Sequence, residues 1–258
     1  MADFFDVLAR NAEETINSEY YETAKTGESI HASLKNAVLE CDVNPIITEI
    51  KAASPSSGVI RTNINHSEIA KGMQRGGAAA ISVLTEPKQF NGSLEALAQT
   101  RKAVKLPILM KDIVLNPVQV FAASKMGANA VLLIKVLFDR GYGDRTIDEM
   151  INGAHMFDLE VLLETHTASE FHAALKTDAD LIGINNRNLG TLKTDLNVTK
   201  KILTKYHARD KIVVSESGIN TSDDIRFLRE SGARAFLVGS AIMSSENIEK
   251  KVRELVNA

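Results

Sequence analysis

The sequence predicts an α/β fold in which eight parallel strands alternate with helices and close into one barrel. Three observations support this fold class. The chain has 258 residues, and an α/β barrel typically needs about 250. Short apolar, β-branched runs recur about every 20 to 35 residues, which is the size of one strand–helix unit. Amphipathic stretches, with apolar residues at helical spacing, lie between these runs.

The predicted elements alternate along the chain from residue 46 onward. We expect strands at Ile46–Ile50, Ala79–Leu84, Ile108–Met110, Ala130–Ile134, Glu160–Leu163, Leu181–Ile184, Ile212–Val214 and Ala235–Val238. We expect helices at Ser67–Arg75, Leu94–Val104, Pro117–Met126, Ala168–Leu175, Leu196–Tyr206, Ser222–Glu230 and Glu246–Val256. This alternation predicts a (β/α)8 TIM barrel. An open doubly wound sheet is the alternative, but it requires a G-x-G-x-x-G loop where this chain has Ser54-Pro-Ser-Ser-Gly58.

Glycines and capping residues mark the ends of the predicted helices. Several predicted helices are followed by a short sequence that begins with glycine, which suits a left-handed C-cap. These sequences are Gly76-Gly-Ala-Ala, Gly127-Ala-Asn-Ala and Gly232-Ala-Arg-Ala. Asn116-Pro117 and Thr221-Ser-Asp-Asp carry the residue types that start helices.

The first 44 residues precede the predicted barrel. Their apolar residues recur at helical spacing over Phe4–Ile16 and Ser29–Leu39, which predicts two helices. We expect residues 1–258 to form a single domain, with the barrel at 45–258 and a helical extension at 1–44 that packs on it. The extension either covers one end of the barrel or forms a belt along its surface.

Composition narrows the class of protein. The chain is 44% hydrophobic and 24% charged with a net charge of −3, which is ordinary for a globular protein. No basic tract indicates nucleic-acid binding, and no long apolar run indicates a signal peptide or membrane span. Cys41 is the only cysteine, which excludes an internal disulfide and a thiolate metal cluster. We therefore expect a cytoplasmic protein, a monomer or weak homo-oligomer, without nucleic-acid or membrane partners.

Polar residues stand at the carboxyl ends of most predicted strands. These ends meet at one mouth of a parallel barrel. The residues that would gather there include Glu49, Lys51, Lys111, Glu164, Asn185, Arg187 and Glu216. A structural ion pair is the alternative explanation for Glu49 and Lys51 alone, but recurrence at six strands favours a functional site.

The last two strands indicate the class of ligand. Ser217-Gly218 and Gly239-Ser240 follow the strands at which barrels often bind phosphate through backbone N–H groups and a short helix. The region Ala241–Asn247 is the candidate for that helix.

The histidines do not form a metal-binding pattern. Only His166, of the six histidines, lies at a predicted strand end, and no pair has H-x-x-x-H or H-x-H spacing with a nearby acid. We expect no metal, and a structural role for His166.

Nine motifs in order together resemble the indole-3-glycerol phosphate synthase family of tryptophan biosynthesis. They are Glu49-Ile-Lys51 with Ser54-Pro-Ser56, Ile81–Glu86, Phe90–Ser93, Leu109–Asp112, Val131–Ile134, Glu164–His166, Gly183–Leu189, Ser215–Ile219 and Phe236–Ser240. The resemblance covers nearly the whole chain from about residue 45, and the N-terminal extension also fits this family.

The resemblance implies a lyase that needs neither cofactor nor metal. Its substrate is a phosphorylated small molecule, 1-(2-carboxyphenylamino)-1-deoxyribulose 5-phosphate. The ring carbon that bears the carboxylate attacks the ribulose carbonyl, and loss of carbon dioxide and water leaves indole-3-glycerol phosphate.

The resemblance also implies catalytic roles. Ring closure builds negative charge on the carbonyl oxygen, so an acid is needed, and Lys111 takes that role. Glu164 is the general base for the later loss of a proton. We expect neighbouring cations to lower the pKa of Lys111. Glu49 either holds the Lys111 ammonium or touches a substrate hydroxyl, and Lys51 is the alternative acid.

Further residues are implied to bind the substrate. Asn185 and Glu216 contact the ribulose hydroxyls or belong to the catalytic network. Lys51 and Arg187 balance the substrate's carboxylate and phosphate, in an order that the sequence leaves open. The other implied contacts are Ser54 at the anthranilate end, an apolar slot of Phe90, Leu132 and Leu189, and a phosphate cradle of Ser217, Gly218, Gly239 and Ser240.

Two features of the slot stay open. Phe4 or Phe5 either closes it from the extension or belongs to the core. Ile113 stands where the family usually carries phenylalanine, so the slot should lack one aromatic wall.

Three other functions compete with this interpretation. Phosphoribosylanthranilate isomerase is the nearest, but it would need neither the extension nor the Glu49/Lys51 pair. Metal-dependent sugar-phosphate epimerases would want histidine ligands that are missing here. A non-catalytic barrel that only binds a phosphorylated metabolite or a partner protein would not need the candidate acid and base.

Overall fold

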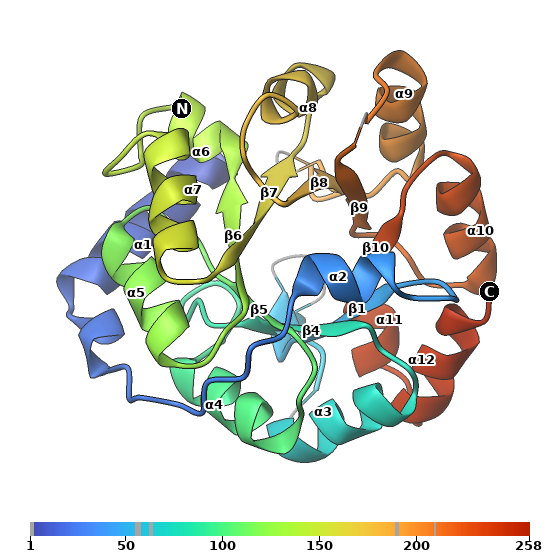
Figure 1. The fold of residues 1–258 in the computed structure, drawn as a ribbon, viewed down its shortest axis with the longest axis horizontal. Coiled ribbons are helices and arrows are strands. Elements are labelled where there is room, and N and C mark those ends of the chain that lie inside the picture. The colour runs from blue at the N-terminus through green and yellow to red at the C-terminus, as the bar shows by residue number, and fades with distance from the viewer. Residues whose placement is uncertain (1–2, 55–57, 62–63, 189–190, 209) are drawn as a thin grey trace.

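The computed structural model describes residues 3–54, 58–61, 64–188, 191–208 and 210–258. Eight parallel strands form a closed barrel in the order β1-β10-β9-β8-β7-β6-β5-β4, and helices surround it (Figure 1). The barrel strands are β1 Ile46–Ile50, β4 Ala80–Leu84, β5 Ile108–Lys111, β6 Ala130–Ile134, β7 Glu160–Thr165, β8 Leu181–Asn185, β9 Ile212–Glu216 and β10 Ala235–Val238. The predicted α/β TIM barrel is confirmed.

The helices follow the strands as predicted, with additional short elements. The helices are α1 Phe4–Asn17, α2 Leu34–Leu39, α3 His66–Arg75, α4 Leu94–Ala103, α5 Pro117–Lys125, α6 Lys135–Asp139, α7 Ile147–Met156, α8 Ala168–Ala174, α9 Asn197–Lys205, α10 Ser222–Glu230, α11 Ser240–Met243 and α12 Ile248–Val256, with a 3-10 turn η1 at Tyr20–Thr23. Strands β2 Ala53–Ser54 and β3 Gly58–Val59 pair antiparallel outside the barrel. The helices α6 and α7 and the β2–β3 pair have no counterpart among the predicted ranges.

Four barrel strands extend further than predicted. Strands β5, β7, β8 and β9 include Lys111, Glu164, Asn185 and Glu216 within their last two residues. These side chains therefore stand on hydrogen-bonded strands, and the strand geometry fixes the direction in which each one points.

Barrel strands are apolar on both faces because each face packs against a different layer. In β6, Ala130, Leu132 and Ile134 belong to the cluster inside the barrel, whereas Val131 and Leu133 pack with the surrounding helices. This pattern explains why the sequence shows continuous apolar runs rather than alternation.

The predicted capping residues are confirmed at two helix starts and two helix ends. Asn116 and Thr221 each form a capping box with the residue three positions later. Gly127 and Gly232 have φ values of 82° and 104°, in the left-handed region that lets a helix turn into the next strand.

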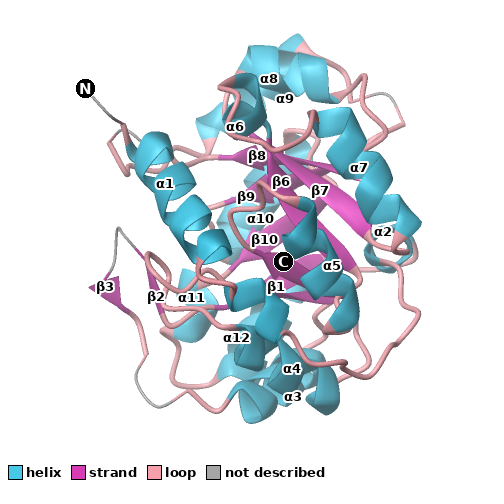
Figure 2. Ribbon diagram, turned by 90° about the vertical axis from the view of Figure 1, so that its left-hand side faces the viewer, coloured by secondary structure: helices cyan, strands magenta, loops and turns pink. Residues whose placement is uncertain are grey.

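The N-terminal segment reaches both ends of the barrel. Helix α1 and helix α2 lie on opposite sides of the strands in Figure 2. Ala9 of α1 and Leu34 of α2 belong to the same apolar cluster as the barrel interior. The Ser33 hydroxyl and the Lys35 N–H donate to Glu160, the first residue of β7, at 2.5 and 2.9 Å. Helix α2 therefore closes the amino end of the barrel, while α1 lies at the carboxyl ends of the strands.

In the part of the chain that the structure describes, no helix combines the length and apolarity needed to cross a membrane.

Candidate active site

A cavity of about 380 Å³ opens where the carboxyl ends of the strands meet. Its volume suits a small ligand, since ligand pockets begin at about 300 Å³. Twelve of the predicted site residues line it: Glu49, Lys51, Phe90, Lys111, Leu132, Glu164, Asn185, Arg187, Ser217, Gly218, Gly239 and Ser240. Glu216 is fully buried beside the cavity and contacts Lys111. Leu189 and the Ser54 side chain lie outside the described residues.

Glu49, Lys51, Lys111 and Glu216 form one network, here called the lysine–glutamate network. Glu49 Oε1 lies 2.7 Å from Lys51 Nζ, and its Oε2 lies 3.0 Å from Lys111 Nζ. Lys111 Nζ also lies 3.5 Å from Glu216 Oε2. Strands β5 and β9, which carry Lys111 and Glu216, stand on opposite sides of the barrel in the strand order. The network therefore crosses the barrel axis.

The charge on Lys111 is stabilised, which reverses the predicted pKa shift. Burial alone would lower the pKa of Lys111, but Glu49, Glu216 and Glu164 more than offset this effect and raise the pKa. The expected lowering was wrong because carboxylates, not cations, surround this ammonium. Lys111 thus stays protonated.

The three buried glutamates differ in how readily they ionise. Burial raises the pKa of each, but the ammonium groups of Lys111 and Lys51 lower the pKa of Glu49 to about 2. The pKa of Glu164 is also lowered, because His166, Lys111 and a bond from Asn185 outweigh burial. The pKa of Glu216 is raised, since burial and repulsion by Glu164 and Glu49 outweigh attraction by Lys111.

Two glycines give these carboxylates room. A Cβ atom on Gly239 would stand 2.4 Å from Glu49 Oε1, and one on Gly183 would stand 2.1 Å from Glu216 Oε1. Both distances are far below a van der Waals contact. A side chain at either position would push the carboxylate away, so glycine lets the backbone pass this close to each carboxylate.

Asn185, the last residue of β8, connects the base candidate to the backbone of Arg187. The Asn185 side chain donates to Glu164 Oε1 at 3.1 Å, and the Arg187 N–H donates to Asn185 Oδ1 at 3.0 Å. The Arg187 guanidinium donates to the Leu192 carbonyl at 2.8 Å. This anchoring holds a cation at the cavity wall, where it can meet an anionic group of a ligand.

The predicted phosphate region faces the same cavity. Ser217 and Gly218 have φ values of 69° and 82°, so two successive residues after β9 adopt the left-handed conformation. Helix α11 begins at Ser240, directly after Gly239, so it starts one residue before the predicted region 241–247, and it ends at Met243. Both turns bring backbone groups to the cavity wall.

Apolar side chains form another part of the cavity wall. Phe4 and Leu8 of α1 line the cavity together with Phe90, Leu132 and Ile113. Phe4 thus closes the slot from the extension, whereas the Phe5 ring packs edge-on against His166. Ile113 lines the cavity at the position where the family usually carries phenylalanine, so this part of the wall is aliphatic instead of aromatic.

Several residues at the site were not predicted from the sequence. Thr194 and Asn220 line the cavity from loops that carry no recognisable motif. His166, for which a structural role was expected, lies with its Nε2 3.1 Å from Glu164 Oε1, a contact that was not predicted from the sequence. Its position two residues after Glu164 was the available signal, because alternate residues of a strand point the same way.

No cluster of three or more histidine, cysteine or acidic residues among the described residues has the arrangement to hold a metal ion.

Comparison with solved structures supports the fold. Thiamine phosphate pyrophosphorylase from Pyrococcus furiosus superimposes with a TM-score of 0.60 over 84% of this chain and 95% of that chain, at 20% identity. At this identity the likeness concerns the barrel alone.

Comparison with known sequences identifies the family. A sequence model described as indole-3-glycerol phosphate synthase matches residues 6–255. The indole-3-glycerol phosphate synthase of Methanocaldococcus jannaschii is 48% identical over 216 residues, which cover 83% of this chain and 78% of that protein. The enzyme of the same name from Desulforamulus reducens is 42% identical over 213 residues, covering 83% and 79%. The chain therefore belongs to the indole-3-glycerol phosphate synthases, the carboxy-lyases of tryptophan biosynthesis that act on a phosphorylated small molecule.

Proposed function

We propose that the described cavity closes the indole ring of 1-(2-carboxyphenylamino)-1-deoxyribulose 5-phosphate, with Lys111 as general acid and Glu164 as general base. The observation that carries this assignment is that an ammonium and an ionised carboxylate, from different strands, line one cavity. Every step then uses side chains of this chain.

Lys111 acts first, during ring closure. Attack of the aromatic carbon on the ribulose carbonyl places negative charge on the carbonyl oxygen, which an adjacent ammonium stabilises and protonates. Glu49 and Glu216 hold that ammonium from two sides. Lys51 shares Glu49 with Lys111 and is the alternative donor.

Glu164 acts after carbon dioxide has left. The hydroxyl group leaves as water when an ammonium group, Lys111 or Lys51, gives it a proton. The new ring loses a proton in the same dehydration, and an ionised carboxylate accepts it. The lowered pKa of Glu164 keeps this group ionised in the free enzyme. Asn185 orients it by donating to Oε1.

The remaining polar groups bind the two anions of the substrate. Arg187 and Lys51 balance its carboxylate and phosphate. The backbone turns at Ser217-Gly218 and Gly239-Ser240 face the cavity where a phosphate would approach N–H groups closely. The aromatic ring of the substrate binds against an apolar wall formed by Phe90, Leu132 and, as proposed from the sequence, Leu189. Ser54, also proposed from the sequence, contacts the anthranilate end of the substrate.

Two substitutions test the acid and base. Lys111→Ala and Glu164→Gln should each lower kcat at least about 100-fold, since positioned acids and bases contribute roughly 10²- to 10⁴-fold. Indole fluorescence follows product formation, and circular dichroism checks the fold.

A surface ion pair provides matched controls. Lys71 and Glu68 lie 3.1 Å apart on α3 with half-exposed side chains. Lys71→Ala and Glu68→Gln should leave kcat unchanged. If the Lys111 and Glu164 variants also turn over at wild-type rates, the assigned roles are wrong.

We further propose that residues 1–258 are one domain, that the enzyme works in the cytoplasm without cofactor or metal, and that it is a monomer or weak homo-oligomer. The sequence supports this through its composition and its lone cysteine. Gel filtration across a range of concentrations, and turnover with and without a chelator, test the oligomeric state and the metal independence.

A further inference from the structure

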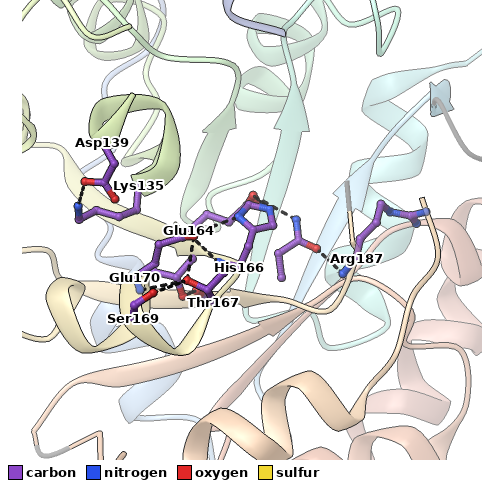
Figure 3. Close-up of polar contacts among 11 residues, drawn as sticks. Lys135, Asp139, Glu164, His166, Thr167, Ser169, Glu170 and Arg187 are labelled. Carbon is purple, nitrogen blue, oxygen red and sulfur yellow. Dashed lines mark hydrogen bonds and ion pairs between the residues drawn. The ribbon is translucent and has the colours of Figure 1, made fainter. Parts of the chain in front are cut away.

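His166 stands between the candidate base and the N-terminal helix. It follows β7 directly, and its side chain is only 10% exposed. Its Nε2 lies 3.1 Å from Glu164 Oε1, and its Nδ1 lies 3.7 Å from Glu170 Oε2 in α8. Figure 3 shows the three side chains as one group at the end of β7. The imidazole is thus placed between two carboxylates.

In the part of the chain that the structure describes, both close polar contacts of the Glu164 carboxylate are made by the same oxygen. His166 Nε2 and Asn185 Nδ2 each lie 3.1 Å from Oε1. Asn185 donates a hydrogen bond to this oxygen, whereas His166 reaches it as an ion pair, without hydrogen-bond geometry at either ring nitrogen. Both contacts are on Oε1, which leaves Oε2 as the atom to take up a proton.

Helix α1 covers the imidazole from the solvent side. The Phe5 ring meets the His166 ring edge-on, with centroids 5.1 Å apart. The Arg140 guanidinium lies over the Phe5 ring, 5.1 Å from its centroid, and pairs with Asp3 and Asp6 at the start of α1. The first turn of α1 is thereby held against His166.

The charges around this group favour a cationic imidazole. Burial lowers the pKa of His166, but Glu164 and Glu170 more than compensate and raise it to about 9. The other charged groups that act on Glu164 are Lys111, which attracts it, and Glu216, which repels it. A cation at His166 lowers the pKa of Glu164 and keeps the base ionised.

We propose that His166 is a positioning residue, which orients and charges the Glu164 carboxylate through Oε1, and that Phe5 of α1 excludes water from this contact. The proposal rests on the role of Glu164 as base. It gives the N-terminal helix a direct effect on the chemistry, in addition to its contribution to the cavity wall.

Two substitutions at residue 166 separate orientation from charge. His166→Ala removes both. We expect kcat to fall roughly 10- to 100-fold, because a small misplacement of a catalytic group lowers the rate by about this much. KM should stay nearly constant. His166→Gln keeps an N–H donor near the position of Nε2 without the charge, so kcat should recover most of that loss. In both variants the acidic limb of the kcat–pH profile should move to higher pH, because Glu164 loses a neighbouring cation.

Phe5→Ala tests the contribution of α1. Water that reaches His166 screens its charge from Glu164, so the acidic limb should move in the same direction by a smaller amount. This variant and His166→Gln keep the proposal testable even if His166→Ala does not fold.

His172 provides the matched control. It is exposed on α8 and stacks on Tyr206, with ring centroids 4.9 Å apart. His172→Ala should reproduce the wild-type kcat and pH profile. An acidic limb that stays at its wild-type position in the His166 variants, or a wild-type kcat in His166→Ala, overturns the proposal.

Glu164→Gln separates this failure from failure of the catalytic assignment. If Glu164→Gln is inactive while the His166 variants behave as wild type, only the positioning role is wrong. If Glu164→Gln turns over normally, the base itself has been misassigned.

Discussion

Glu49 and Glu216 contact the same lysine, yet their pKa values shift in opposite directions. Glu49 lies within 3.0 Å of two ammonium groups, which outweigh its burial. Glu216 lies 3.5 Å from one ammonium and is repelled by two carboxylates. At the scale of single residues, the number of cations within reach therefore decides which buried carboxylate ionises first. Glu49 acts as the fixed anion that holds Lys111.

Gly183→Ala tests how tightly Glu216 is enclosed. The new Cβ would stand 2.1 Å from Glu216 Oε1, so the carboxylate must move away from Lys111. We expect kcat to fall at least tenfold. The free energy of unfolding should drop by about 1–3 kcal/mol, which is the usual destabilisation when a side chain is added to a filled core. Steady-state kinetics and urea unfolding measure the two effects.

Gly153 in α7 is the matched control for this substitution. A Cβ atom there meets nothing within 4 Å. Gly153→Ala should leave kcat unchanged and stabilise the protein by about 0.5–1 kcal/mol, because alanine loses less backbone entropy in a helix. Normal turnover by Gly183→Ala would show that the position of Glu216 does not matter.

At the scale of elements, helix α1 is fixed at its first turn. Arg140, the residue that caps α6, bonds both Asp3 and Asp6, and Tyr142 donates to Asp6 at 2.8 Å. These contacts keep Phe4 at the cavity wall. Helix α1 precedes the barrel strands instead of following one of them, so its placement depends on such side-chain contacts and on its apolar face.

Arg140→Ala should weaken substrate binding. Loss of the anchor lets the start of α1 leave the cavity, and roughly 1 kcal/mol of lost binding corresponds to about a fivefold rise in KM. Arg145, which lies in the following loop with a 61% exposed side chain, is the control. Equal KM values for Arg140→Ala and Arg145→Ala would contradict this role of the anchor.

At the scale of the whole molecule, barrel closure assembles the site. Strand β1 lies opposite β7, and β5 lies opposite β9, in the closed strand order. Glu49, Glu164, Lys111 and Glu216 come from these four strands. Closure therefore concentrates like and unlike charges around the barrel axis, and the stability of the fold becomes linked to their protonation.

The stability of the wild-type enzyme should fall between pH 6.5 and 9 because of His166. The pKa of this group rises from 6.5 to about 9 on folding. Its contribution is therefore fully present below pH 6.5 and is lost as the pH rises through the folded value. The shift corresponds to as much as about 3 kcal/mol, at roughly 1.4 kcal/mol per pKa unit.

His166→Gln isolates this contribution. Urea-unfolding midpoints measured from pH 5 to pH 9 should fall more steeply in the wild type than in the variant. Parallel curves for the two proteins would show that His166 keeps its ordinary pKa in the folded state.

The succession of elements was predictable because it depends on local pattern. Strands β1, β6 and β10 have the predicted bounds, since apolar runs ending at polar residues mark them clearly. The ends of β5, β7, β8 and β9 were placed too early. Polar residues such as Lys111 and Glu216 normally signal a strand end, but here they continue the hydrogen-bonded ladder.

The pKa shifts at the site were less predictable than the residues that form it. The charged residues at the predicted strand ends indicated the lysine–glutamate network, because the last residues of all parallel strands lie at the same mouth of the barrel. The direction of the Lys111 pKa shift was missed, since the sequence does not show which charged side chains come within contact distance of the ammonium.

The sequence by itself determined the order of strands and helices, the family, and the residue types that gather at the mouth, because each of these depends on pattern along the chain. Only the tertiary structure decided which oxygen meets which nitrogen, that Phe4 reaches the cavity while Phe5 covers His166, and that carboxylates outnumber cations around Lys111. These features depend on distances between strands and helices that are remote in sequence, and barrel closure sets those distances.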